Sequence, residues 1–70
     1  MKYKTREDFI ADIGIRKLGL VEYIAKLESE GKTEHEIQGI LLSNQVSKTP
    51  RTLDADWKFY KTVRPKVSWI

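Results

Sequence analysis

The segment TEHEIQGILLS, residues 33–43, gives the strongest local indication of structure in this chain. A threonine followed three residues later by a glutamate is a capping box. In such a box the Thr33 hydroxyl accepts a hydrogen bond from the Glu36 amide, and the Glu36 carboxylate accepts one from the Thr33 amide. Apolar residues then recur at helical spacing, namely Ile37, Ile40 and Leu41. The segment therefore predicts a helix that begins at Thr33 and ends near Ser43.

A second helix is predicted to start a few residues later. Thr49 is a suitable N-cap, with Ser47 as the competing cap. Pro50 takes the first helical position, where a missing amide hydrogen costs nothing. Pro65 disfavours helical backbone in the residue before it, so this helix should end near Arg64.

One side of this second helix has the pattern of a buried core. The row at i, i+4, i+7 and i+11 consists of Leu53, Trp57, Tyr60 and Arg64, with Val63 beside it. Phe59 lies outside the row and is either a second core contact or an interface residue. Residues 43–45, Ser-Asn-Gln, are expected to form the turn between the helices, with Val46 as an apolar contact within it.

The N-terminal half shows weaker helical patterns that are separated by glycines. Thr5 followed by Asp8 resembles an N-cap, and apolar spacing continues through Phe9, Ile10 and Ile13. Gly14 should weaken this helix and Gly19 should end it, whereas Gly31 is a natural stop for the next helix. The apolar face of that next helix consists of Leu20, Val21, Ile24 and Leu27.

These patterns predict an all-α fold, a single domain over residues 1–70 built as a small bundle of about four helices. Residues 33–64 would form a helix-turn-helix unit, in which a short turn joins two helices. The tail, residues 65–70, alternates apolar and polar side chains and should be extended or fold back. The sequence assigns no role to it.

The unit resembles small helix-turn-helix DNA-binding domains of bacteria and phages over residues 33–53. The matching positions are Thr33, Glu36-Ile37, Ile40-Leu41, Val46-Ser47 and Thr52-Leu53. The chain departs from that pattern at Gln38-Gly39, where a small residue usually follows the Glu-Ile pair directly, and in residues 42–45, which make a longer turn. The resemblance implies that the helix over residues 49–64 is a recognition helix that binds double-stranded DNA.

Positive charge is concentrated in the last third of the chain. The whole sequence has 13 Lys and Arg against 10 Asp and Glu, a net charge of +3. Residues 47–70 contain six basic residues, Lys48, Arg51, Lys58, Lys61, Arg64 and Lys66, against only Asp54 and Asp56. This clustering suits a polyanionic partner, and an ordinary solvated face is the alternative.

The predicted DNA-binding residues lie opposite the apolar row or just before the helix. They are Lys48, Arg51, Thr52, Ala55, Lys58, Lys61 and Thr62. Arg51 should contact a base, because its guanidinium matches the two acceptors of guanine, while the lysines hold phosphates. Asp54 opposes this interpretation unless it accepts a hydrogen bond from a cytosine or pairs with Lys58.

We therefore expect a DNA-binding transcriptional regulator or accessory factor, with a homodimer or a larger assembly as its working form. A second hypothesis is a protein-binding module, such as a small phage-type inhibitor or adaptor of a larger host enzyme. That module would use Phe59, Trp69 and Ile70. A third hypothesis is a non-catalytic component of a DNA-packaging or replication complex.

Several other classes of function are not expected. The chain has no cysteine and one histidine, His35, so disulfides and the usual small-domain zinc sites are excluded, and no cofactor or metal is expected. The acidic pairs Glu28/Glu30 and Asp54/Asp56 should be solvated, and no Ser-His-Asp set is present, so an enzyme is not expected.

No apolar run approaches the roughly 18–20 residues of a membrane span, and the N-terminus does not resemble a signal peptide, which indicates a cytoplasmic protein.

Overall fold

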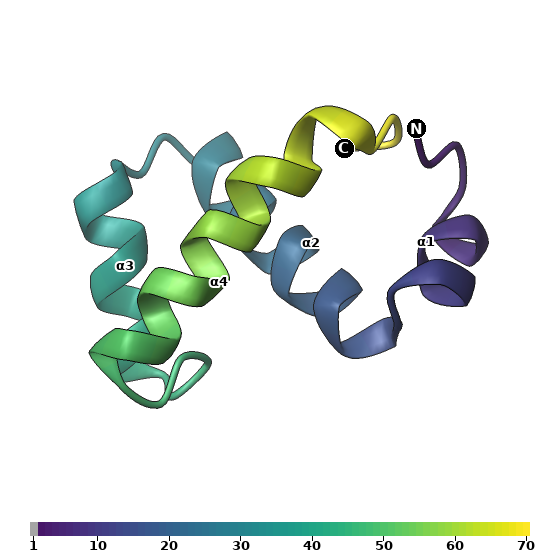
Figure 1. The fold of residues 1–70 in the computed structure, drawn as a ribbon. Coiled ribbons are helices and arrows are strands. Elements are labelled where there is room, and N and C mark those ends of the chain that lie inside the picture. The colour runs from purple at the N-terminus through teal and green to yellow at the C-terminus, as the bar shows by residue number, and fades with distance from the viewer. Residues whose placement is uncertain (1) are drawn as a thin grey trace.

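Four α-helices account for most of the computed structural model, which describes residues 2–70. They are α1 (Arg6–Asp12), α2 (Ile15–Ser29), α3 (Glu34–Ser43) and α4 (Pro50–Val63), and a 3-10 turn, η1 (Arg64–Lys66), follows. α2 contacts α1, α3 and α4, and α3 also contacts α4. Figure 1 shows α1 and α3 at opposite ends of the molecule, with α4 crossing in front of α2. The predicted all-α fold is confirmed.

Within residues 2–70, none of these helices combines the length and apolar character that crossing a bilayer requires.

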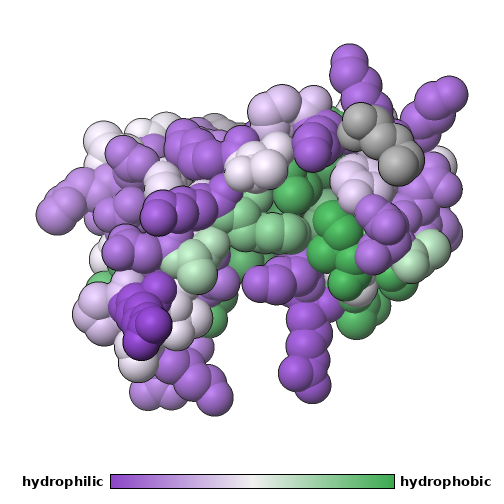
Figure 2. All heavy atoms as spheres, viewed as in Figure 1, coloured by the Kyte–Doolittle hydropathy of each residue, from purple (hydrophilic) through white to green (hydrophobic). Residues whose placement is uncertain are grey.

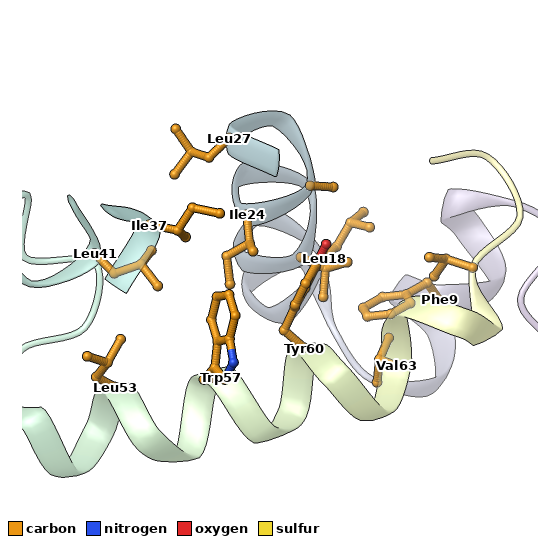
Figure 3. Packing of buried hydrophobic residues seen from close by; sticks show 13 residues of the cluster. Phe9, Leu18, Ile24, Leu27, Ile37, Leu41, Leu53, Trp57, Tyr60 and Val63 are labelled. Atoms are coloured by element: carbon orange, nitrogen blue, oxygen red, sulfur yellow. The ribbon is translucent and has the colours of Figure 1, made fainter. Parts of the chain in front are cut away.

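The hydrophobic core lies where α4 packs on α2 and α3. The predicted burial of Leu53, Trp57 and Tyr60, with Val63 beside them, is confirmed, whereas Arg64, the last residue of the predicted row, is only half-buried and caps α4. The buried side chains that surround this row in Figure 3 include Phe9, Leu18, Ile24, Leu27, Ile37 and Leu41. Burying one large apolar side chain stabilises a fold by about 1.5–3 kcal/mol, so this cluster is the main source of stability in so short a chain.

The three predicted threonine N-caps are confirmed. Thr5, Thr33 and Thr49 each accept a hydrogen bond from the amide three residues later, at 3.1 to 3.2 Å. Thr49, and not Ser47, is therefore the cap of α4. At Thr33 the capping box is complete, because its amide donates to Glu36 Oε1 at 3.0 Å. That bond lowers the pKa of the Glu36 carboxyl.

The prediction that Gly19 ends the first helix is wrong, because the break comes earlier, at Gly14. Gly14 has a φ of 126°, which residues with a Cβ rarely adopt, and the chain leaves helical geometry there, between α1 and α2. Gly19 lies inside α2. An interior glycine costs a helix only about 1 kcal/mol, less than the burial of Leu18 and Val21 on either side of it contributes. Of the stripe expected on α1, Phe9 is buried, Ile13 is half-buried and Ile10 is exposed.

The end of α2 at Gly31 follows the prediction. Gly31 has a φ of 86°, and its amide donates to the Glu28 carbonyl at 3.0 Å. The Lys32 amide donates to the Leu27 carbonyl at 3.3 Å. These two bonds form a Schellman motif, which satisfies carbonyls left free at the end of a helix.

The C-terminal tail folds back along the N-terminus, which decides between the two alternatives left open by the sequence. The Ser68 amide donates to the Tyr3 carbonyl at 3.3 Å. The Trp69 ring packs edge-on against Phe9 at 6.2 Å between centroids, and its Nε1 donates to Glu22 Oε2 at 3.1 Å. The two ends of the described part of the chain, residues 2–70, therefore lie close together (Figure 1).

Tyr60 combines core packing with a polar contact. Its ring is buried against Trp57, with 5.8 Å between ring centroids, and its hydroxyl donates to the Glu28 carboxylate. Burial, together with this hydrogen bond, raises the pKa of Tyr60 well above its ordinary value of 10.0.

The free energy of unfolding is expected to fall as the pH rises above about 10. The folded chain keeps the Tyr60 proton where the unfolded chain loses it, so this stabilisation is complete below the unfolded pKa and is lost at higher pH. Tyr60→Phe should remove much of the slope in urea unfolding measured from roughly pH 8 to 11. The remainder should come from Tyr3, whose pKa is raised by its hydrogen bond to the Asp12 carboxylate. An unchanged slope in Tyr60→Phe would contradict this assignment.

Substitution of two glycines should have opposite effects on stability. Gly19→Ala should raise the free energy of unfolding by about 0.5–1 kcal/mol, because an added Cβ meets nothing within 4 Å and alanine favours the helix. Gly14→Ala should lower it by about 1 kcal/mol or more, because a φ of 126° is strained for alanine. Thermal unfolding followed by circular dichroism measures both. Shifts of the same sign would show that the helix break is misplaced.

Candidate nucleic-acid interface

The outward side of α4 is mostly polar and has more cations than carboxylates. Arg51, Ala55, Lys58 and Thr62 occur at i, i+4, i+7 and i+11, so they form one row along the helix, and all four are exposed. The other three predicted DNA-binding residues, Lys48, Thr52 and Lys61, are exposed as well. Figure 2, drawn from the same side as Figure 1, shows hydrophilic side chains along much of α4 and apolar surface beside it toward α1.

Three of these side chains are held by contacts within α4. Lys61 Nζ lies 5.2 Å from the centroid of the Trp57 ring, a cation–π distance. The Thr62 hydroxyl donates to the carbonyl four residues before it at 2.9 Å. The Thr52 hydroxyl lies 3.0 Å from the hydroxyl of the cap residue Thr49. Both threonine hydroxyls therefore already have a partner in the helix.

The remaining cations are available for a ligand. Lys48, Arg51 and Lys58 have no carboxylate within 4.0 Å among the residues that the structure describes. Asp54 is exposed and, in the same part of the chain, does not form the ion pair with Lys58 that would have neutralised it. The outward face thus has free positive charge and one free carboxylate at its edge.

Asp56, which was expected to be solvated, is buried, and that expectation is wrong. Its exposed fraction is 8%. One carboxylate oxygen accepts a hydrogen bond from the Ser47 hydroxyl at 2.7 Å, and the other lies 3.9 Å from Lys17 Nζ. At 3.6 residues per turn, Asp56 borders the buried row of α4 and therefore points toward α2 and the turn before α4.

The turn before α4 also buries a different residue from the one predicted. Val46 is 41% exposed, whereas Ser47 is fully buried. Gln45 has a φ of 58°, which redirects the chain, and the Ser47 amide then donates to the Leu41 carbonyl at 3.0 Å. The sequence gives only partial indications of the Ser47–Asp56 contact: Ser47 is the competing cap of α4, and Asp56 borders its apolar row. The sequence indicates no partner for the Lys17 cation.

The residues predicted for a protein partner are partly used within the fold. Phe59 is half-buried, and Lys17 Nζ lies 4.8 Å from its ring centroid. Trp69 is half-buried against Phe9, while Ile70 is exposed. His35 is exposed.

Comparisons with protein-family models, with curated protein sequences and with solved structures give no match for this chain.

Asp56→Ala should lower the free energy of unfolding by about 1.5–3 kcal/mol, because it leaves the buried Ser47 hydroxyl without an acceptor. Asp54→Ala is the matched control and should change stability by no more than about 0.5 kcal/mol, because Asp54 is exposed. Chemical denaturation measures both values. Equal effects of the two substitutions would contradict a structural role for the Ser47–Asp56 hydrogen bond.

Proposed function

We propose that this protein binds double-stranded DNA through the outward face of α4 and acts as a small transcriptional regulator or accessory factor. In this proposal α3 and α4 form a helix-turn-helix unit, with α4 as the recognition helix. The observation that supports it most directly is the exposed row of Arg51, Ala55, Lys58 and Thr62, opposite the buried row of the same helix.

The dimensions of α4 suit the major groove of DNA. Its 14 residues extend about 21 Å, and a helix with side chains is about 10–12 Å across, close to the width of that groove. Ala55 and Thr62 alternate with the two cations and are small, so they allow the helix backbone to approach base edges. Arg51 lies in the first turn of α4, the part of a recognition helix that contacts bases in helix-turn-helix proteins.

The charge distribution favours the same face. Asp56 is turned away from it and is paired with Ser47 and Lys17, so only one of the two carboxylates of α4 is exposed. Lys48, Lys58 and Lys61 would hold phosphates, while Arg51 would contact a base. Each phosphate contact releases counterions from DNA and contributes to affinity without regard to sequence.

One recognition helix reads only a short site. A homodimer would present two copies of α4 to successive major grooves, about 34 Å apart along the duplex. A dimer therefore completes this proposal.

Binding to random duplex DNA should be detectable at low salt in an electrophoretic mobility shift assay. With phosphate contacts from Lys48, Lys58 and Lys61, the logarithm of the association constant should fall with the logarithm of the salt concentration with a slope of about −3. Arg51→Ala combined with Lys58→Ala should weaken binding at least about tenfold, by removing one base contact and one phosphate contact.

The matched control is Lys4→Ala combined with Lys26→Ala. It removes the same charge from exposed positions outside α4 and should have a smaller effect on affinity. Equal loss in the two double variants would indicate nonspecific charge attraction. The absence of any shift at low salt would reject DNA binding altogether.

A further inference from the structure

A groove lies beside α4, where α2, the turn before α4 and α4 itself meet. Its volume is about 460 Å³, within the range of about 300–1,000 Å³ that is typical of ligand sites. It is formed mainly by one face of α2 and by Val46 of the turn, with Asp56 as the contribution of α4. The groove does not include the outward row of α4, so the proposed DNA-binding function does not account for it.

The α2 side of the groove has an apolar, hollowed centre. Arg16, Gly19, Leu20 and Tyr23 line it at i, i+3, i+4 and i+7, and therefore share one face of the helix. Gly19 leaves this face open, since a Cβ at its position would meet nothing within 4 Å. Leu20, which is half-buried, and the exposed side chain of Val46 border the opening. The centre of the groove can therefore accept an apolar side chain.

The two ends of this face offer hydrogen-bond donors. Arg16 is exposed and, among residues 2–70, has no carboxylate within 4.0 Å. The Tyr23 oxygen accepts a hydrogen bond from Asn44 Nδ2 at 3.1 Å, so the Tyr23 hydroxyl keeps its own proton for an acceptor. Asp56 opposes an anion there less than a free carboxylate would, because the Ser47 hydroxyl donates to it and the cation of Lys17, which also lines the groove, lies 3.9 Å away. A basic ligand would instead face Arg16.

We propose that this groove binds an acidic peptide segment of a partner protein, in which two carboxylates are separated by two apolar residues. Arg16 and Tyr23 are seven residues apart on α2, about 10 Å along the helix axis. A peptide in the polyproline II conformation rises about 3.1 Å per residue, and residues i and i+3 lie on the same side of it, about 9 Å apart. Its two carboxylates would therefore meet Arg16 and the Tyr23 hydroxyl, while an apolar side chain between them enters the space above Gly19.

The test is a nuclear magnetic resonance titration of the isotope-labelled chain with the acetylated, amidated tetrapeptide Asp-Leu-Phe-Asp. The amides of residues 16–23 and of Val46 should shift, with a dissociation constant of about 1 mM for so short a peptide. The control peptide Asn-Leu-Phe-Asn has the same shape without the charge and should cause much smaller shifts. The proposal is overturned if these amides do not shift at about 10 mM acidic peptide, or if the two peptides act equally.

Matched variants locate the site. Arg16→Gln should weaken peptide binding about threefold, the effect of one exposed ion pair, whereas Lys26→Gln, which removes a cation of α2 outside the groove, should not. Gly19→Leu fills the groove and should abolish binding. Gly39→Leu makes the same change at an exposed glycine of α3 that also has free space around it, and should leave binding intact.

Both glycine variants should keep the helical circular dichroism spectrum, so a loss of binding can be separated from a loss of fold. Retained binding in Gly19→Leu, or equal loss in Gly39→Leu, would place the peptide elsewhere and overturn the proposal. The double variant Arg51→Ala, Lys58→Ala should bind the peptide normally. A failure of the DNA proposal is therefore distinguishable from a failure of this one.

Discussion

The burial of Trp57 and Tyr60 against α2 determines which side chains this protein presents to its surroundings. A helix has 3.6 residues per turn, so burying one row places the opposite row, which contains Arg51 and Lys58, toward solvent. A rotation of α4 by one residue position would move polar and charged groups toward the core, which is costly unless they find partners there. The cationic face is thus a direct consequence of core packing.

Apolar contacts alone would let α4 slide along its axis or rotate about it to some extent. The hydrogen bond from Ser47 to Asp56 limits both movements. Hydrogen bonds are directional, and a buried carboxylate without partners is expensive. This bond therefore fixes the start of α4 relative to the turn, while Lys17 links both to α2. These contacts affect both proposed surfaces. Asp56 is turned away from the outward face of α4, and inside the groove the Lys17 cation offsets part of its charge.

The features that could be predicted from the sequence are those set by residues close together in the chain. The capping box at Thr33, the cap at Thr49 and the buried row of α4 are local patterns, and the structure contains all of them. The prediction at Gly19 is wrong because tertiary burial of its neighbours, Leu18 and Val21, outweighs the local preference of glycine to end a helix. The pairing of the buried Asp56 with the exposed Lys17 joins residues on different helices, and no spacing rule within one helix can indicate such a contact. For the same reason, the candidate face on α4 was foreseeable, whereas the groove was not.

The two proposed surfaces meet at the turn before α4, since Val46 borders the groove and Lys48 belongs to the candidate DNA face. An acidic segment in the groove would bring negative charge toward the phosphates of bound DNA. At physiological ionic strength, salt screens the interaction between exposed charges that are more than about 8 Å apart. The screening is weaker where protein, and not water, lies between the charges. Linkage requires that the effect be mutual: the factor by which the segment lowers DNA affinity equals the factor by which DNA lowers affinity for the segment. An acidic partner would then oppose DNA binding through charge alone, without any change in the fold.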